Sequence, residues 1–398
     1  MFRIQTYNKI AVEGLELLSR AHYEVAGEIP NPDAILVRSA DLHGIKIPDS
    51  VNAIVRAGAG VNNIPIAQCS ERGIVVFNTP GANANAVKEL VLSSLFLASR
   101  RIVDAIIWGK SLGESAANSS EKIEELVEKC KSNFEGPEIR GKTLGIIGLG
   151  AIGVMVANDA VGLGMEVIGF DPYISVDSAW SLSRNVRHAE TIEEVLSKSD
   201  YVTIHVPYSE KTKNMLNADK IKMMKCGARI LNFARGGLAK EGDITAALDS
   251  GRLSLYVTDF PTQELLAHNK VICMPHIGAS TPEAEINCAV TAVKQLKTFL
   301  ETGNIKNSVN YPYCRLDQNG AASCAHRLLV ANKNIPNMVG QITTLLAGGK
   351  INITDLINHH KENYAYNIID TEQKIPQSIL DELKKVPGIV RVRTIDGE

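Results

Sequence analysis

The stretch Thr143-Leu-Gly-Ile-Ile-Gly-Leu-Gly-Ala-Ile-Gly153 decides the fold of the central part of this 398-residue chain. Thr143 to Ile147 has the composition of a buried β-strand, and the Gly-x-Gly-x-x-Gly pattern follows it directly and opens an apolar helix. In this pattern Gly148 permits a tight turn, Gly150 lets the backbone approach a pyrophosphate, and Gly153 lets helix and strand pack closely. The stretch therefore predicts a strand, a phosphate-binding turn and a helix.

Asp171 strengthens this interpretation. It ends the next predicted strand, Glu166 to Phe170, about twenty residues after the glycines, as expected for a dinucleotide-binding unit. A carboxylate there can accept hydrogen bonds from both hydroxyls of the adenosine ribose and repels a 2′-phosphate. We therefore expect the cofactor NAD rather than NADP. The alternative is a glycine-rich turn in an α/β core without a ligand.

Strands and helices alternate on both sides of this unit, which is typical of doubly wound parallel sheets. Between residues 140 and 280 the further strands are expected at Tyr201 to His205, Arg229 to Asn232, Leu255 to Val257 and Val271 to Cys273. Before them, strands are expected at Ala34 to Val37, Ala53 to Val55 and Ile74 to Phe77, and a helix at Ala86 to Arg101. We predict a substrate-binding domain at 1–97 and 283–310, with an NAD-binding Rossmann domain at 98–282 inserted into it. Residues 113–122 are expected to be an exposed connection.

The C-terminal part predicts a third, smaller domain. Residues 311–322 are interpreted as a linker. The domain at 323–398 has strands expected at 326–331, 351–357, 364–370 and 389–394, with helices at 336–346 and 376–385. The order βαββαβ is that of a ferredoxin-like fold. Its open sheet could pair with a second copy.

Composition excludes several classes of protein. With 42 basic and 44 acidic side chains the net charge is −2, so no overall field attracts nucleic acid or an anionic membrane. The seven cysteines include no Cys-x-x-Cys pair, which indicates reduced thiols in the cytoplasm and no metal site. The most apolar stretch, Leu144 to Met165, is interrupted by Asn158 and Asp159 and is a poor membrane span.

Polar groups follow three of the predicted strands, in the loops 232–237, 259–264 and 274–280. Removing a hydride from an alcohol requires a base for the hydroxyl proton and a cation for the substrate's carboxylate and the developing carbonyl. His276 and Arg235 have the right chemistry for these roles, and Glu264 can favour the protonated imidazole. Taken singly, each could be a structural or solvated side chain.

These motifs together resemble the D-2-hydroxyacid dehydrogenases. The likeness covers nearly the whole chain, in the order Val37-Arg-Ser39, Arg56 to Ile64, Asn78-Thr-Pro80, the glycine motif, His205-Val-Pro207, Ala234 to Gly237, Asp259 with Glu264, and Pro275 to Thr281. The resemblance implies that Arg235, Glu264 and His276 are catalytic and that Asp259 binds the nicotinamide amide. It implies further NAD contacts at Thr79, Ala151, Ile152, Val206, Pro207, Phe233, Ala234, Gly278 and Ala279. Members often have Asp-Val-Phe and a Pro after the Glu, where this chain has Asp259-Phe-Pro and Leu265.

Substrate choice depends on the first domain. Backbone N–H groups of Gly58, Ala59, Gly60 and Val61 could form an anion-binding nest. Arg38, with Ser39, and Arg56 follow apolar strands and resemble the phosphate-binding arginines of the branch that oxidises 3-phosphoglycerate. The alternatives are a glyoxylate or hydroxypyruvate reductase, another D-2-hydroxyacid dehydrogenase, or a non-catalytic NAD sensor.

The third domain resembles ACT domains, which bind amino acids at an interface between chains. The resemblance implies feedback regulation by L-serine through Asn332, Asn334 and Asn352, and a homodimer or homotetramer. Asn337 stands where a Gly is usual after the Pro, and Asn tolerates the left-handed conformation that this position needs.

Overall fold

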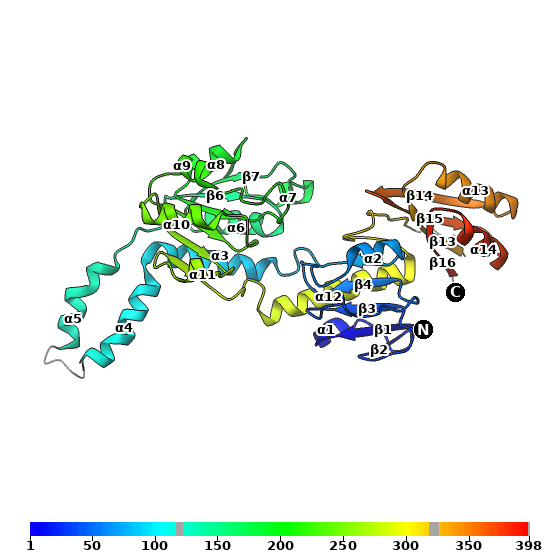
Figure 1. Ribbon diagram of the computed structural model, residues 1–398, viewed down its shortest axis with the longest axis horizontal. Helices are drawn as coiled ribbons and strands as arrows, with labels where there is room; N and C mark the ends of the chain where they lie inside the picture. The colour runs from blue at the N-terminus through cyan, green and yellow to red at the C-terminus, as the bar shows by residue number, and fades with distance from the viewer. Residues whose placement is uncertain (117–121, 318–325, 397–398) are drawn as a thin grey trace. The chain divides into compact units, whose positions relative to one another are not determined.

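The computed structural model describes residues 1–116, 122–317 and 326–396, and it divides into two compact units (Figure 1). Unit 1 contains Met1–Asn83 and Pro282–Glu398, and unit 2 contains Ala84–Thr281. Helix α3 (Ala84–Arg100), which the sequence analysis assigned mainly to the first domain, belongs to unit 2 because it packs on α6, β10 and β11. Its Val87, Val91 and Leu95 are buried there.

The first sheet of unit 1 is parallel, in the order β2 (Tyr23–Ala26), β1 (Phe2–Tyr7), β3 (Ala34–Val37), β4 (Ala53–Arg56) and β5 (Val75–Phe77). Helix α12 (Pro282–Thr302) and the short α1 (Val12–Leu15) pack on each other, and α12 covers one face. The other face buries Ile35, Ile54 and Val76 in a second cluster, beside α2 (Ile66–Glu71). Because both faces are covered, the central strands are apolar without interruption, as predicted.

Unit 2 contains a seven-stranded parallel sheet. Its order is β12 (Val271–Cys273), β11 (Leu253–Thr258), β10 (Ala228–Asn232), β9 (Tyr201–Ile204), β6 (Thr143–Ile147), β7 (Glu166–Phe170) and β8 (Val186–His188). The helices of this unit that follow strands are α6 (Ala151–Gly162), α7 (Val176–Ser181), α8 (Ile192–Lys198), α9 (Ala218–Met223), α10 (Glu241–Asp249) and α11 (Gln263–Leu266). The predicted doubly wound fold is confirmed, and β8 is a short strand that the pattern did not indicate.

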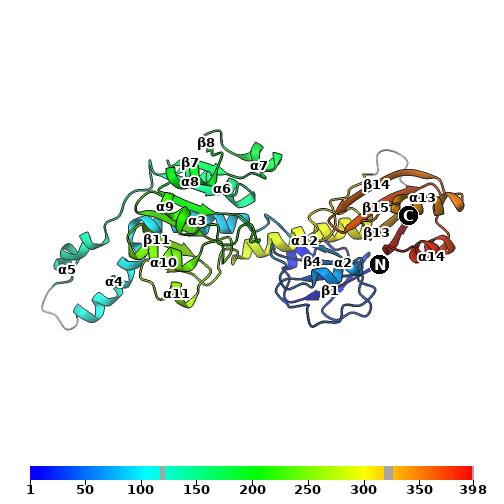
Figure 2. The same ribbon diagram turned by 45° about the horizontal axis from the view of Figure 1, so that its top comes forward.

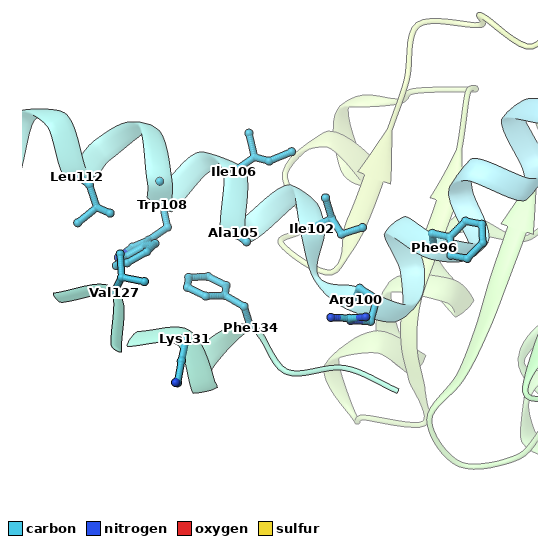
Figure 3. Close-up of a pocket in the computed structure, with 11 residues that line it drawn as sticks. Phe96, Arg100, Ile102, Ala105, Ile106, Trp108, Leu112, Val127, Lys131 and Phe134 are labelled. Carbon is cyan, nitrogen blue, oxygen red and sulfur yellow. The ribbon is translucent and has the colours of Figure 1, made fainter. Parts of the chain in front are cut away.

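A helical hairpin extends unit 2 where an exposed connection was expected. Helix α4 (Ile102–Ala116) includes residues 113–116 of that segment, and α5 (Ile123–Cys130) and the 3-10 turn η1 (Lys131–Phe134) follow. The rings of Trp108 and Phe134 lie 5.3 Å apart. Figure 3 shows an apolar groove around them, which none of the predicted site residues lines. Residues 117–121 of the expected connection lie outside the described residues.

The third domain forms an antiparallel sheet in the order β14 (Ile353–Lys361), β15 (Tyr364–Thr371), β13 (His326–Lys333) and β16 (Ile389–Asp396). Figure 2 shows α13 (Met338–Gly348) and α14 (Gln377–Lys385) on one side of it, which confirms the βαββαβ prediction. The opposite face packs within unit 1, where Leu329 and Tyr366 join the core around Phe77 and Phe299.

The segment interpreted as a linker is packed over its first half. Tyr311 and Cys314 are fully buried, and the Tyr311 hydroxyl donates a hydrogen bond to the Ser70 carbonyl oxygen at 2.9 Å. The linker prediction was therefore wrong for this part, because the aromatic ring and the thiol complete the core of unit 1. Residues 318–325, which hold the rest of the linker and the start of the third domain, lie outside the described residues.

Candidate active site

The predicted residues of unit 2 follow six neighbouring strands at one edge of the sheet. Parallel strands bring their carboxyl ends together, and ligands of such sheets bind at that edge. His276 follows β12, Asp259 follows β11 and Arg235 follows β10. Next in the sheet are Val206 and Pro207 after β9, the glycine loop after β6, and Asp171 after β7. The sheet therefore places these residues of unit 2 along one edge.

The glycine loop has the geometry that close phosphate binding requires. Gly148 has a left-handed φ of 96°, and a Cβ on it would lie 2.6 Å from the His205 carbonyl oxygen. A Cβ on Gly153 would lie 2.0 Å from the Gly148 carbonyl oxygen. At Gly150, by contrast, a Cβ would meet nothing within 4 Å. Open space therefore faces Gly150 at the start of α6, where Ala151 and Ile152 form the first turn. The N–H groups of a helix N-terminus suit an anion such as a pyrophosphate.

Asp171 is held by backbone groups of two loops. One carboxylate oxygen accepts a hydrogen bond from the Leu149 N–H at 2.8 Å, and the other accepts one from the Tyr173 N–H at 2.8 Å. The carboxylate is thus tied to the glycine loop, where an adenosine ribose would lie beside the pyrophosphate.

Asp259 is a buried carboxylate whose two oxygens differ in their hydrogen bonding. Its Oδ2 accepts a hydrogen bond from the Gly278 N–H at 3.1 Å, and its Oδ1 has no hydrogen-bond partner among the described residues. Burial raises the pKa of the Asp259 carboxyl above its ordinary value, and the Gly278 N–H, His276 and Arg235 act in the opposite direction. An unpartnered buried acceptor suits an amide donor such as the nicotinamide carboxamide.

His276 is exposed, and its backbone holds it in an unusual conformation. Its φ is 49°, in the left-handed region, and its N–H donates to the Asp259 carbonyl oxygen at 3.0 Å. The imidazole lies against the ring of Phe260, with the ring centres 4.9 Å apart and the planes at 50°. The contact with Phe260 was not predicted, although Phe260 stands at the position where the sequence departs from the family pattern.

Glu264 lies in the first turn of α11, which Thr262 caps through a hydrogen bond from the Leu265 N–H to its hydroxyl. Within the described part of the chain, the Glu264 carboxylate accepts its hydrogen bond from the Thr245 hydroxyl, at 2.9 Å, and not from His276. The structure thus places Glu264 after the same strand as Asp259, with its carboxylate turned to α10.

Arg235 is exposed on a loop that the buried Asn232 shapes. The Asn232 side chain donates to the Arg235 carbonyl oxygen at 2.9 Å and accepts from the Ala234 N–H at 3.2 Å. Phe233 is buried beside it. Asn232 is a positioning residue that the sequence analysis did not single out, and an amide at the end of an apolar strand was the available signal.

The predicted substrate residues lie together in unit 1. Arg56 donates from Nε to the Arg38 carbonyl oxygen at 2.9 Å and from Nη1 to the Gly60 carbonyl oxygen. The loop is further tied by hydrogen bonds from Asn78 to the Ala59 carbonyl oxygen and from the Thr79 N–H to the Gly58 carbonyl oxygen, at 2.6 and 3.1 Å. Thr79 is fully buried, and the Ser39 N–H is held by Asn8.

The predicted effector residues have different environments. Asn332 is buried, and its side chain accepts from Asn367 and donates to the Lys333 carbonyl oxygen, both at 2.7 Å. Asn334 and Asn352 are exposed, and Asn334 donates to the Glu362 carbonyl oxygen at 3.1 Å. Asn337 adopts the left-handed conformation expected of it, with φ 64°.

In residues 1–116, 122–317 and 326–396, no three His, Cys, Asp or Glu side chains are grouped as metal ligands would be. Across the same residues, no helix combines the length and the apolar character needed to span a bilayer.

Comparison with known proteins identifies the family. The family model described as D-isomer specific 2-hydroxyacid dehydrogenase, NAD binding domain, matches residues 112–278. D-3-phosphoglycerate dehydrogenase from Haemophilus influenzae is 30% identical over 353 residues, covering 84% of this chain and 79% of that protein. The enzyme of the same name from Methanocaldococcus jannaschii is 34% identical over 343 residues, covering 84% of this chain. This chain spans only 61% of the Methanocaldococcus protein's length.

A solved structure agrees with these matches. The NAD⁺-bound 3-phosphoglycerate dehydrogenase of Entamoeba histolytica superposes with a TM-score of 0.59 and 28% identity, covering 78% of this chain and 98% of that one. The glycine loop, Asp171 and the orphaned oxygen of Asp259 fit the NAD-binding domain that the family model describes. The chain belongs to the D-isomer specific 2-hydroxyacid dehydrogenase family.

Proposed function

We propose that the protein oxidises 3-phospho-D-glycerate at C2 to 3-phosphohydroxypyruvate with NAD, the first step towards L-serine. The observation that carries this proposal is the pair Arg38 and Arg56 beside the Gly58–Val61 loop. Two guanidinium groups next to a loop of backbone N–H donors suit a substrate with both a phosphate and a carboxylate. The relatives named D-3-phosphoglycerate dehydrogenase support the same substrate.

In this proposal His276 takes the proton of the C2 hydroxyl. The exposed imidazole is within reach of solvent for release of that proton, and Arg235 holds the substrate's carboxylate and the oxygen that becomes the carbonyl. Glu264 favours the protonated imidazole once its carboxylate turns from Thr245 to His276. When bound, NAD supplies C4 of its nicotinamide ring as the hydride acceptor.

The residues proposed to hold NAD form three groups by the part of the cofactor they contact. Gly148, Gly150, Ala151, Ile152 and Gly153 hold the pyrophosphate at the start of α6. Asp171 holds the adenosine ribose. Asp259 holds the carboxamide, with Thr79, Val206, Pro207, Phe233, Ala234, Gly278 and Ala279 as further contacts.

Regulation by L-serine is part of the proposal. The exposed Asn334 and Asn352 are the side chains available to an effector, whereas Asn332 is committed to Asn367 and Lys333. We propose that Asn332 shapes the site through these neighbours and that the protein assembles as a homodimer or homotetramer.

A second candidate function is reduction of glyoxylate or hydroxypyruvate. The ion pair between Arg38 and Glu285 favours this second function, because an arginine that is already paired with a carboxylate is less available to bind a substrate phosphate. The experiment that separates the two measures NADH formation from 3-phosphoglycerate, with and without L-serine, and NADH consumption with hydroxypyruvate and glyoxylate.

The variants Arg38→Ala and Arg56→Ala complete this test. If the phosphate is bound as proposed, each variant should raise KM for 3-phosphoglycerate about tenfold or more. This factor corresponds to the free energy of one lost hydrogen bond between charged groups. Rapid glyoxylate reduction that neither variant changes, with no turnover of 3-phosphoglycerate, would replace the first function with the second.

A further inference from the structure

Arg38, one of the two arginines assigned to the phosphate, holds a carboxylate of its own chain. Its Nη2 lies 2.5 Å from Oε1 of Glu285, in the first turn of α12. Both side chains are about two-fifths exposed, at 40% and 43%. The pair is therefore open to solvent, and an incoming anion can compete for Arg38.

Arg56 is held differently. Its guanidinium donates to the carbonyl oxygens of Arg38 and Gly60, which orient it. The bond to the Arg38 carbonyl oxygen also links the two arginines through the backbone. Any anion that Arg56 attracts thus lies near the Arg38–Glu285 pair.

The surroundings of Cys288, one helical turn after Glu285, place these charges close together. Its thiol is buried, and this burial raises the pKa of the thiol. The charges of Arg38 and Arg56 lower that pKa, whereas the charge of Glu285 raises it. Both arginines and the glutamate therefore lie close enough to Cys288 to act on the same thiol.

We propose that Glu285 is a specificity-determining residue, which competes with the substrate's phosphate for Arg38. This inference rests on the proposed function. A phosphate must displace the carboxylate, which then remains nearby as a like charge. The repulsion grows with the charge of the substrate, so Glu285 weakens binding of a phosphate dianion more than binding of an unphosphorylated 2-hydroxyacid.

The test is Glu285→Gln, with Glu283→Gln as its matched control. Glu283 is exposed in the same first turn of α12, so its variant makes the same change in net charge and in the charge near the helix N-terminus. We expect Glu285→Gln to lower KM for 3-phosphoglycerate by about three- to tenfold, with a smaller effect on kcat, because the pair is partly exposed and screened. KM for unphosphorylated D-glycerate should change less than twofold, and Glu283→Gln should match the wild type.

A second measurement does not depend on turnover. Inorganic phosphate should raise the Tm of Glu285→Gln at lower concentrations than it does for the wild type, and Arg38→Ala should lose most of this response. If the wild type fails to oxidise 3-phosphoglycerate but this order of phosphate binding holds, the anion site stands and the proposed function falls. The inference is overturned if Glu285→Gln leaves both KM and phosphate binding unchanged, or if Glu283→Gln has the same effect.

Discussion

The ring of Phe260 lies 4.9 Å from the imidazole of His276, and the two planes meet at 50°. Phe260 also approaches the loop after β10, since a Cβ on Gly236 would lie 3.6 Å from the Phe260 Cβ. The aromatic ring restricts the orientations that the exposed imidazole can adopt. The Glu264 carboxylate lies on Thr245, so Phe260 is a neighbour that orients the proposed base.

Replacing Phe260 by leucine should therefore lower kcat. Proton transfer requires the imidazole to be held in position at the substrate hydroxyl. Loss of the aromatic ring leaves the exposed imidazole freer to adopt other orientations, and kcat should fall by about threefold to tenfold with a smaller change in KM. Phe260→Tyr is the control that keeps a ring and should keep the wild-type kcat. Equal kcat values for all three proteins would show that Phe260 only fills space.

Asp259→Asn should separate stability from cofactor binding. Because burial raises the pKa of Asp259, its ionised form destabilises the folded state at neutral pH. Asparagine can still accept the Gly278 N–H, so Tm of the protein without NAD should rise. The gain should be largest near pH 7 and disappear below about pH 4, where the unfolded aspartate is also protonated. NAD affinity, measured by calorimetry, should fall, and a variant that binds NAD as well as the wild type would remove Asp259 from the cofactor site.

Asp171→Asn tests cofactor choice without removing the contact to the glycine loop. The amide oxygen can replace Oδ2 as acceptor for the Leu149 N–H. The negative charge that repels a 2′-phosphate is lost, so the ratio of kcat/KM for NAD over NADP should fall by roughly tenfold. An unchanged ratio would contradict the ribose assignment.

The sequence predicted the strands better than the contacts between them. Strands β6, β7 and β12 have the predicted bounds, because glycines, prolines and charged residues stand at or near their ends. The sequence predicted helix α4 poorly. Its apolar residues Ile106 and Ile107 are exposed, so they do not form the buried stripe by which an amphipathic helix is recognised. The pair Arg38–Glu285 joins residues 247 apart, and no local pattern indicates it. The contact between Phe260 and His276 likewise depends on how β11 and β12 end side by side.

The lowered pKa of His205 leads to a prediction about how the stability of unit 2 depends on pH. Burial lowers the pKa of His205 to about 4, and the Nε2 of the neutral ring pairs with the Thr203 hydroxyl at 3.0 Å. The unfolded chain therefore binds more protons than the folded chain between about pH 4 and 6.5, and stability is lost as pH falls through this window. From pH 7 to pH 5 the loss due to His205 should be about 2 kcal/mol. In His205→Gln the Tm should change less over this range, and an identical change in both proteins would assign the acid sensitivity to other groups.

The buried ion pair between Arg327 and Asp370 leads to a prediction about how the third domain is attached to helix α12. Both side chains are 3% exposed, and the guanidinium binds both carboxylate oxygens, at 2.6 and 2.8 Å. Arg327 also donates to the carbonyl oxygens of Thr302, which ends α12, and Leu316. Arg327→Met leaves a buried carboxylate without its partner, which costs about 3–5 kcal/mol. Because the lost bonds join the third domain to α12, hydrogen exchange should increase first in β13 and β15 and leave the strands of unit 2 unchanged.

The double variant Arg327→Met/Asp370→Leu is the control for this last prediction. It removes the buried charge together with its partner, and replacing a buried pair by apolar side chains is often neutral. Protection of β13 and β15 should therefore recover in part. Exchange that increases equally in unit 2 would mean that Arg327 stabilises the whole chain rather than the anchor between the third domain and α12.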